Sequence, residues 1–153
     1  MQKINLYCVG NLKDLPFIKM CEEYSKRISR FAKLNIIELK EKNELNLPQL
    51  ISREESAEIL NKISCDKIIL FDVKGESLSS EEFASLLDKH FQTNSEISFV
   101  IGGSYGVSQE IKQNCKQKIS VSKMTFPHRL FRVMALEQIY RALTILNNIS
   151  YHK

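Results

Sequence analysis

Two loops in the last third of the chain carry the residue types that bind a small polar ligand. The first follows an apolar run, Phe99-Val100-Ile101, and reads Gly102-Gly103-Ser104-Tyr105-Gly106. The second reads Val121-Ser122-Lys123-Met124-Thr125-Phe126 and precedes Pro127 and His128. Because glycine has no Cβ, main-chain N–H and C=O groups in such loops can approach a ligand closely. The loops predict a ligand site, in which a side chain added at Gly103 is expected to intrude on the ligand.

The glycine segment taken alone is also typical of a tight turn that binds nothing. It is not a phosphate-binding loop of the Walker type, because no Lys-Ser or Lys-Thr pair follows it at the required spacing. It also lacks the Gly-x-Gly-x-x-Gly spacing of dinucleotide-binding folds. The class of ligand therefore depends on the rest of the chain.

The composition is that of one globular domain spanning residues 1–153. Hydrophobic residues make up 43% of the chain, which is enough for a core. No stretch reaches the ~18 consecutive apolar residues of a membrane span, and the N-terminus lacks a secretory signal pattern, so a cytoplasmic protein with no membrane partner is expected. A net charge of +4 suits occasional contact with phosphates without requiring it.

The four cysteines are widely spaced along the chain, at Cys8, Cys21, Cys65 and Cys115. They form no Cys-x-x-Cys pair, and no histidine lies at metal-ligand spacing from them. We expect small buried thiols, with no disulfide and no metal site.

Apolar runs alternate with helical patterns, which predicts an α/β fold with a mostly parallel sheet of five to six strands covered by helices on both faces. The first helix is expected to follow Asp14, with Pro16 in its first turn. Capping-box patterns predict a second helix from Ser52 and a third from Ser79. The last helix spans about Leu130 to Asn147, and the charged segment Lys40 to Pro48 is read as a mobile loop. The expected strands are 4–9, 34–39, 67–73, 97–101 and 118–121.

Several motifs resemble one family when they are taken together and in order. They are Ile4 to Gly10, Glu23 to Arg27, the segment IGGSYG, the segment SVSKMTFPHRLFRVMALEQIYRA and the terminal YHK. This combination resembles the bacterial ribosomal RNA large-subunit methyltransferase H family of the SPOUT class over the whole chain. Asn11 departs from the pattern, because many members have lysine there, which leaves contact of position 11 with substrate open.

The resemblance implies a homodimeric enzyme with a C-terminal trefoil knot, the α/β-knot of SPOUT proteins. It implies transfer of a methyl group from S-adenosylmethionine to N3 of a pseudouridine in helix 69 of 23S rRNA, on the assembled ribosome. The alternative is a noncatalytic, ribosome-associated RNA-binding module. Such a module would need the basic residues of the chain but not its ligand loops.

The resemblance also implies a set of cofactor contacts, in which backbone groups recognise the adenine and Met124 and Phe126 form an apolar wall. Phe71, at the end of the third expected strand, is one of these contacts, and Gly102 and Gly103 are two more. The rest of the set is the contiguous run Val121, Ser122, Lys123, Met124, Thr125 and Phe126.

His128, Arg132, Tyr151 and His152 are the candidates for positioning the substrate. His128 stands at a helix start and is also compatible with simple packing; it, His152 or a water is the expected acceptor of the N3 proton. Arg132 and Arg141 are expected to hold phosphate or to pair with Glu137. The resemblance implies that the tail reaches substrate from the neighbouring subunit.

Two further patterns leave a choice between structure and binding. Lys26, Arg27, Arg30 and Lys33 place a basic stripe on the first helix, which is either a solvated face or a track for rRNA phosphates. The last helix is apolar around almost its full circumference, which predicts deep burial or a partner subunit. We expect a homodimer on this ground.

Overall fold

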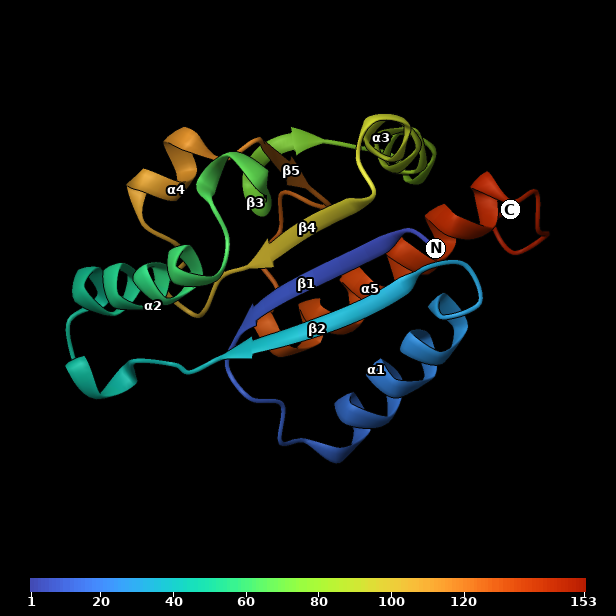
Figure 1. Cartoon of the computed structure of the whole chain (residues 1–153). Coiled ribbons are helices and arrows are strands. Elements are labelled where there is room, and N and C mark those ends of the chain that lie inside the picture. The colour runs from blue at the N-terminus through green and yellow to red at the C-terminus, as the bar shows by residue number, and fades with distance from the viewer.

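The computed structural model describes residues 1–153 and contains one five-stranded sheet whose strands all run parallel (Figure 1). The strand order is β2-β1-β4-β3-β5. This confirms the expected α/β fold class. The strands are β1 Lys3–Val9, β2 Lys33–Leu39, β3 Ile68–Ser77, β4 Glu96–Ile101 and β5 Gln117–Ser120.

Five α-helices cover both faces of this sheet. One face carries α1, α3 and α5, and the other carries α2 and α4. None of the helices combines the length and the apolar composition that a membrane crossing needs. The helices are α1 Leu15–Ile28, α2 Pro48–Lys62, α3 Ser80–Thr93, α4 Gln109–Asn114 and α5 His128–Leu146, with 3-10 turns at Asn43–Leu45 and Cys65–Lys67.

Alternating residues of β1 show why the strands are apolar throughout. Ile4 and Leu6 pack into the core beneath α1, α3 and α5, whereas Tyr7 and Val9 pack into the smaller core beneath α2 and α4. A parallel sheet buried on both faces needs apolar side chains at odd and even positions alike. Cys8, on the same strand, and Cys21 are buried thiols as expected, whereas Cys65 and Cys115 are partly exposed. Burial raises the pKa of Cys8 to about 12.

The helix starts test the capping patterns. Ser79 caps α3 and forms the reciprocal capping box with Glu82, as expected. The expected start of the second helix at Ser52 is wrong: α2 begins at Pro48, about one turn earlier, and Ser52 is buried inside it. Proline favours the first helical position, where its missing N–H costs nothing. Asp14 occupies the N-cap position of α1, but its side chain makes no capping hydrogen bond.

The order of the strands reverses between β1 and β4. The chain adds β2 on one side of β1, then crosses to the other side for β3, β4 and β5. In open α/β sheets, ligands bind beyond the carboxyl ends of the strands at such a reversal. This arrangement is consistent with the trefoil knot that the resemblance implies. It also brings the loops that follow β4 and β5 together at the carboxyl ends of the strands.

The apolar circumference of α5 is used largely within the chain. The helix lies between α1 and α3 against the sheet, and Val133, Leu136, Ile139 and Leu143 are buried there. Deep burial, rather than a partner subunit, therefore accounts for most of its apolar residues.

Gly75 marks a close approach between β3 and β5. The pairing of these strands shifts register between Phe71 and Glu76, and a Cβ atom at Gly75 would lie 2.6 Å from the backbone nitrogen of Ile119. Backbone cannot move aside as a flexible side chain can. Only glycine fits at this crossing.

We expect Gly75→Ala to lower the free energy of unfolding by about 3 kcal/mol, because the added methyl overpacks against backbone. Urea unfolding measures this. Ser77→Ala, at an exposed position of the same strand, is the control and should change stability by less than about 0.5 kcal/mol. Equal stability of the two variants would contradict the close approach.

Candidate functional site

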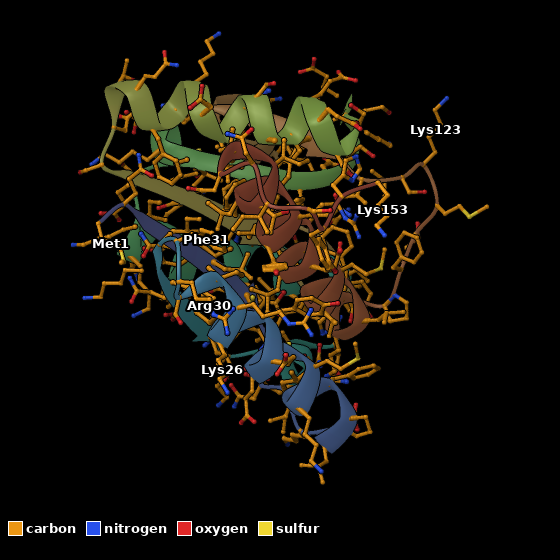
Figure 2. The ribbon with its side chains drawn as sticks, turned by 90° about the vertical axis from the view of Figure 1, so that its right-hand side faces the viewer. Met1, Lys26, Arg30, Phe31, Lys123 and Lys153 are labelled. Carbon is orange, nitrogen blue, oxygen red and sulfur yellow. The ribbon has the colours of Figure 1, made fainter.

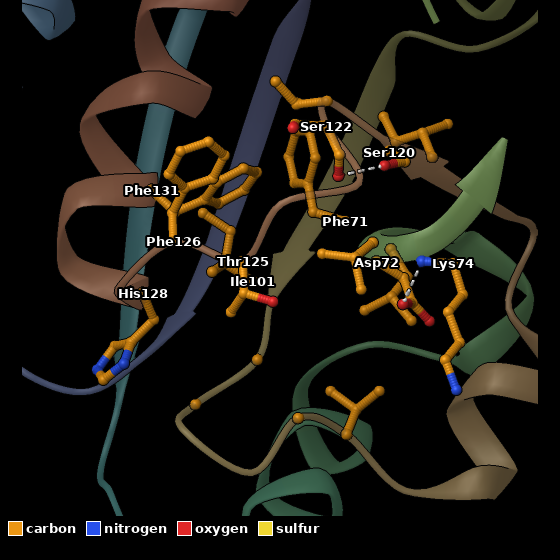
Figure 3. A pocket seen from close by; sticks show the side chains of 18 of the residues that line it. Phe71, Asp72, Lys74, Ile101, Ser120, Ser122, Thr125, Phe126, His128 and Phe131 are labelled. Atoms are coloured by element: carbon orange, nitrogen blue, oxygen red, sulfur yellow. Dashed lines mark hydrogen bonds between the residues drawn. The ribbon is translucent and has the colours of Figure 1, made fainter. Parts of the chain in front are cut away.

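A cavity of about 330 Å³ opens beyond the carboxyl ends of β4 and β5 and beside the middle of β3 (Figure 3). Its walls come from five parts of the chain: Leu70–Lys74, Ile101–Val107, Lys112 on α4, Ile119–Phe126 and the start of α5. The volume lies in the range of about 300 to 1,000 Å³ typical of sites for small molecules and cofactors. The fold therefore joins the two expected ligand loops in one cavity.

The expected cofactor contacts line this cavity with one exception. Phe71, Gly102, Gly103, Val121, Ser122, Met124, Thr125 and Phe126 all contribute to its walls. Lys123 does not; its side chain projects away from the body of the molecule (Figure 2). Asp72, Lys74 and Lys112 also line the cavity, and no motif in the sequence indicates them. Lys112 was missed because the six-residue α4 is too short for a helical period to show.

Phe71 forms the apolar back wall of the cavity. Its ring stacks on Phe99 with the ring centres 5.4 Å apart and meets Phe131 edge-on at 5.2 Å. Aromatic pairs in such geometries add roughly 0.5 to 1.5 kcal/mol each beyond their buried area. The wall is therefore rigid, and it presents an aromatic face to whatever occupies the cavity.

Hydroxyl groups shape the second loop. The Ser120 hydroxyl donates a hydrogen bond of 2.8 Å to the Ser122 carbonyl, and the Met124 N–H donates to the Ser122 hydroxyl at 3.0 Å. These bonds satisfy polar groups within the loop itself. Met124 is left 73% exposed at the rim of the cavity.

The glycine loop is a tight turn supported from behind by α2. The Gly106 N–H donates to the Gly103 carbonyl at 3.0 Å, and Gly106 has a left-handed φ of +71°. From α2, the Ser52 hydroxyl donates to the Gly106 carbonyl at 3.3 Å, and the Ser108 N–H donates to the Ser56 hydroxyl at 2.8 Å. The turn is therefore fixed in place.

Gly103 is constrained from inside the protein rather than from the ligand side. A Cβ atom there would lie 2.8 Å from Oε1 of Glu55 and 3.0 Å from Val9. The first contact of a side chain at this position is therefore with the interior. This differs from the expectation that such a side chain would intrude directly on the ligand.

His128 begins α5 and lines the cavity, with its side chain only 16% exposed. Its Nε2 lies 3.2 Å from Oε1 of Glu41, and Nη2 of Arg129 lies 3.4 Å from the same oxygen. Glu41 belongs to the segment Lys40 to Pro48, whose composition predicts a mobile loop. This end of the segment contacts the start of α5 and orients the imidazole.

Arg132 does not line the cavity. It is 3% exposed, and its guanidinium donates to Oε2 of Glu38 at 2.6 Å and to the Gly10 carbonyl at 2.8 Å. Glu38 thus takes the place of Glu137, which pairs with Arg141 instead. Burial acts to raise the pKa of Glu38, but the hydrogen bonds from Arg132 and the Leu12 N–H outweigh it, and the pKa lies below its usual range.

The C-terminal tail lies at the other end of α5. The Tyr151 hydroxyl donates to Glu137 at 3.1 Å, and the Tyr151 ring packs edge-on against Tyr140 at 4.8 Å. His152 Nε2 lies 2.6 Å from Oε1 of Glu81, in the first turn of α3. These contacts fold the tail back along the second half of α5, and no tail residue lines the cavity of its own chain.

A family model described as a predicted SPOUT methyltransferase matches residues 2–152. Ribosomal RNA large subunit methyltransferase H from Mycoplasmopsis synoviae (strain 53) is 48% identical over 151 residues, and that from Caldicellulosiruptor saccharolyticus is 45% identical over 153 residues. Each alignment covers 98% of this chain and 99% of the relative. The chain belongs to this methyltransferase family. The resemblance seen in the motifs is thereby confirmed.

The fold is also similar to that of a probable methylase family protein from Haemophilus influenzae Rd KW20. The TM-score is 0.50 at 10% sequence identity, and the match covers 95% of this chain and 66% of the other. At this identity the likeness concerns the fold alone.

No group of three or more His, Cys, Asp or Glu side chains lies close enough together to hold a metal ion.

We expect Arg132→Ala to lower the free energy of unfolding by roughly 2 to 3 kcal/mol. This loss of stability is somewhat smaller than for a fully buried ion pair, because the Glu38 side chain is 38% exposed. Urea unfolding of Arg129→Ala is the control. Arg129 is 40% exposed and in the same helical turn, and its loss should cost no more than about 1 kcal/mol.

The difference in free energy of unfolding between wild type and Arg132→Ala should also become smaller at acid pH. The pKa of Glu38 is lower in the folded protein than its ordinary value of 4.5. The Glu38 carboxylate therefore stabilises the fold above pH 4.5, and this stabilisation is lost as the pH falls through the pKa of the folded state. A difference that stays constant from neutral pH into the acid range would show that the Arg132 contribution does not depend on the Glu38 charge.

Proposed function

We propose that the chain transfers the methyl group of S-adenosylmethionine to N3 of a pseudouridine in helix 69 of 23S rRNA, within assembled ribosomes in the cytoplasm. The observation that carries this proposal is the single cavity in which Phe71, the glycine loop and the loop 121–126 meet. Membership in a family whose relatives bear the name of rRNA methyltransferases supports a large-subunit RNA substrate.

The residues of the cavity fit S-adenosylmethionine. Phe71, Phe126 and Phe131 offer aromatic surface for the adenine, and the two loops offer backbone groups for its polar edge. Lys74 and Lys112 are the lining cations suited to the methionine carboxylate. The bound cofactor would supply a methyl carbon already activated by a sulfonium, so no covalent nucleophile is needed from the protein.

The task left to the chain is positioning and proton removal. Transfer is fastest when donor carbon and acceptor nitrogen are held about 3 to 3.5 Å apart and in line. His128 lines the same cavity, and its contact with Glu41 fixes the direction of the ring. We propose His128, with His152 or a water as alternatives, as the group that accepts the N3 proton.

We further propose that the enzyme acts as a homodimer, in which the tail of one subunit completes the site of the other. The tail folds back along the second half of α5, where Tyr151 contacts Glu137 and His152 contacts Glu81, and none of its residues lines the cavity of its own chain. Exposed apolar side chains stand in the segments around the cavity, at Val73, Tyr105, Val121, Met124 and Leu130. Covering that rim with a second subunit would bury them.

The central test is transfer of labelled methyl from S-adenosylmethionine to free 23S rRNA, 50S subunits, 70S ribosomes and, as control, 30S subunits. We expect cofactor binding by calorimetry and labelling of 70S ribosomes at one pseudouridine, with no label in 30S subunits. Ribosome binding without cofactor binding or label would favour the noncatalytic RNA-binding module instead.

We expect deletion of Tyr151, His152 and Lys153 to lower the transfer rate by about 100-fold while changing cofactor affinity by less than about twofold. Aromatic stacking on an unpaired base contributes roughly 1 to 3 kcal/mol, and misplacement of the base adds to that loss. Equal loss of rate and of cofactor affinity would mean that the tail supports the fold.

A mixing experiment tests whether the tail acts across subunits. One partner carries the deletion, and the other carries Gly102→Val, whose side chain would press on Val107 at 3.1 Å and distort the glycine loop. If tails serve the neighbouring cavity, mixed dimers regain one working site. If each tail serves its own chain, mixing restores nothing.

A further inference from the structure

A buried carboxyl group, that of Glu55 on α2, lies directly behind the glycine loop. Glu55 is 2% exposed, and its Oε2 accepts a hydrogen bond of 2.9 Å from the Lys42 N–H. Its Oε1 is buried and has no hydrogen-bond partner. A buried polar atom without a partner costs free energy, so its place in the structure needs a reason.

One side of this carboxyl faces the glycine loop. Ser52, Glu55 and Ser56 are spaced by three and four residues, so they share one face of α2. The two serines hydrogen-bond to the backbone at Gly106 and Ser108, and Oε1 of Glu55 lies 2.8 Å from the position that a Cβ atom at Gly103 would take. This face of α2 therefore supports the loop at three points.

The other side of the carboxyl fixes the segment that orients His128. Lys42, whose N–H is bonded to Glu55, directly follows Glu41. The Glu41 side chain contacts both His128 and Arg129. A continuous chain of contacts thus runs from the glycine loop through Glu55 and Glu41 to the imidazole.

We propose that Glu55 is a positioning residue that holds the glycine loop and the Glu41–His128 contact in register with each other. The inference rests on the proposed function, in which the loop binds the cofactor and His128 faces the base. One buried side chain then positions both the loop that binds the cofactor and the histidine that faces the base.

The neutral form of the carboxyl suits this position. Burial, and next the negative charges of Glu41 and Glu44, raise the pKa of Glu55, while the Lys42 N–H and the Lys42 charge oppose them. Ionisation would place a charge on an oxygen that no donor meets, close against Gly103. Deprotonation is therefore expected to loosen the loop.

The test compares Glu55→Gln, Glu55→Ala and the control Glu58→Gln. Glu58 lies on the same helix and approaches the Lys42 ammonium at 3.7 Å, but its side chain is 46% exposed. We expect S-adenosylmethionine affinity to fall roughly tenfold in Glu55→Ala, through loss of a buried hydrogen-bond acceptor. At a pH where Glu55 of wild type is protonated, the affinity should stay within about twofold in Glu55→Gln, which keeps the shape and the acceptor, and in Glu58→Gln.

The pH profile tests whether the proton on Glu55 supports the loop. A raised folded pKa means that the folded state binds the extra proton, so wild type loses stability and affinity as the pH rises from the ordinary value of 4.5 through the folded value. Glu55→Gln has no titrating proton at this position, so its stability and affinity should not fall over the same pH range. A profile in Glu55→Gln identical to that of wild type would overturn the proposal, even if Glu55→Ala does not fold.

The His128 ring resonances in NMR spectra provide a readout that needs no cofactor. They should move in Glu55→Ala and stay in place in Glu58→Gln. If wild type binds no S-adenosylmethionine, the proposed function fails, while the resonances still decide whether Glu55 controls His128. A folded Glu55→Ala with normal affinity and unmoved resonances would refute the positioning role.

Discussion

The site depends on where α5 begins, and the buried guanidinium of Arg132 fixes that point. Through Glu38 and the Gly10 carbonyl, Arg132 ties the first turns of α5 to the ends of β2 and β1. The loop that precedes the helix must then pass the ends of β5 and β4, and His128 is placed at the cavity wall. A charge this deeply buried is stable only with partners that match its geometry, so the helix has little freedom to shift.

The two faces of the sheet divide the work of building the cavity. The face under α1, α3 and α5 supplies the aromatic wall through Phe71, Phe99 and Phe131. The opposite face supplies the polar support, since α2 holds the glycine loop with hydroxyl groups and sets Glu55 behind it. An apolar wall and a fixed polar loop are what a small polar ligand with a flat ring requires. Substitutions in α2 are thus able to alter the site without touching its lining.

Prediction from the sequence succeeded where the signal was local and periodic. The five strands, the reciprocal cap at Ser79 and the long last helix follow from alternation, capping chemistry and the 3.6-residue period. It failed at α2 and α4. At Ser52 a capping pattern competed with Pro48 one turn earlier, and α4 is too short to show a period. The segment after Lys40 was read as mobile because a contact such as Glu41 with His128 leaves no trace in composition.

The sequence by itself determined the fold class, the two loops of small and hydroxylated residues and, through its motifs, the family, because these depend on neighbouring residues and their order. The tertiary structure decided which side chains share a space. Lys74 and Lys112 line the cavity, Arg132 and Lys123 do not, and Glu55 lies close to Gly103. Such contacts join residues far apart in the chain, such as Gly10 and Arg132, which are 122 positions apart, and the chain order does not encode them. They follow only when the crossing of strands and the packing of helices have fixed each backbone in place.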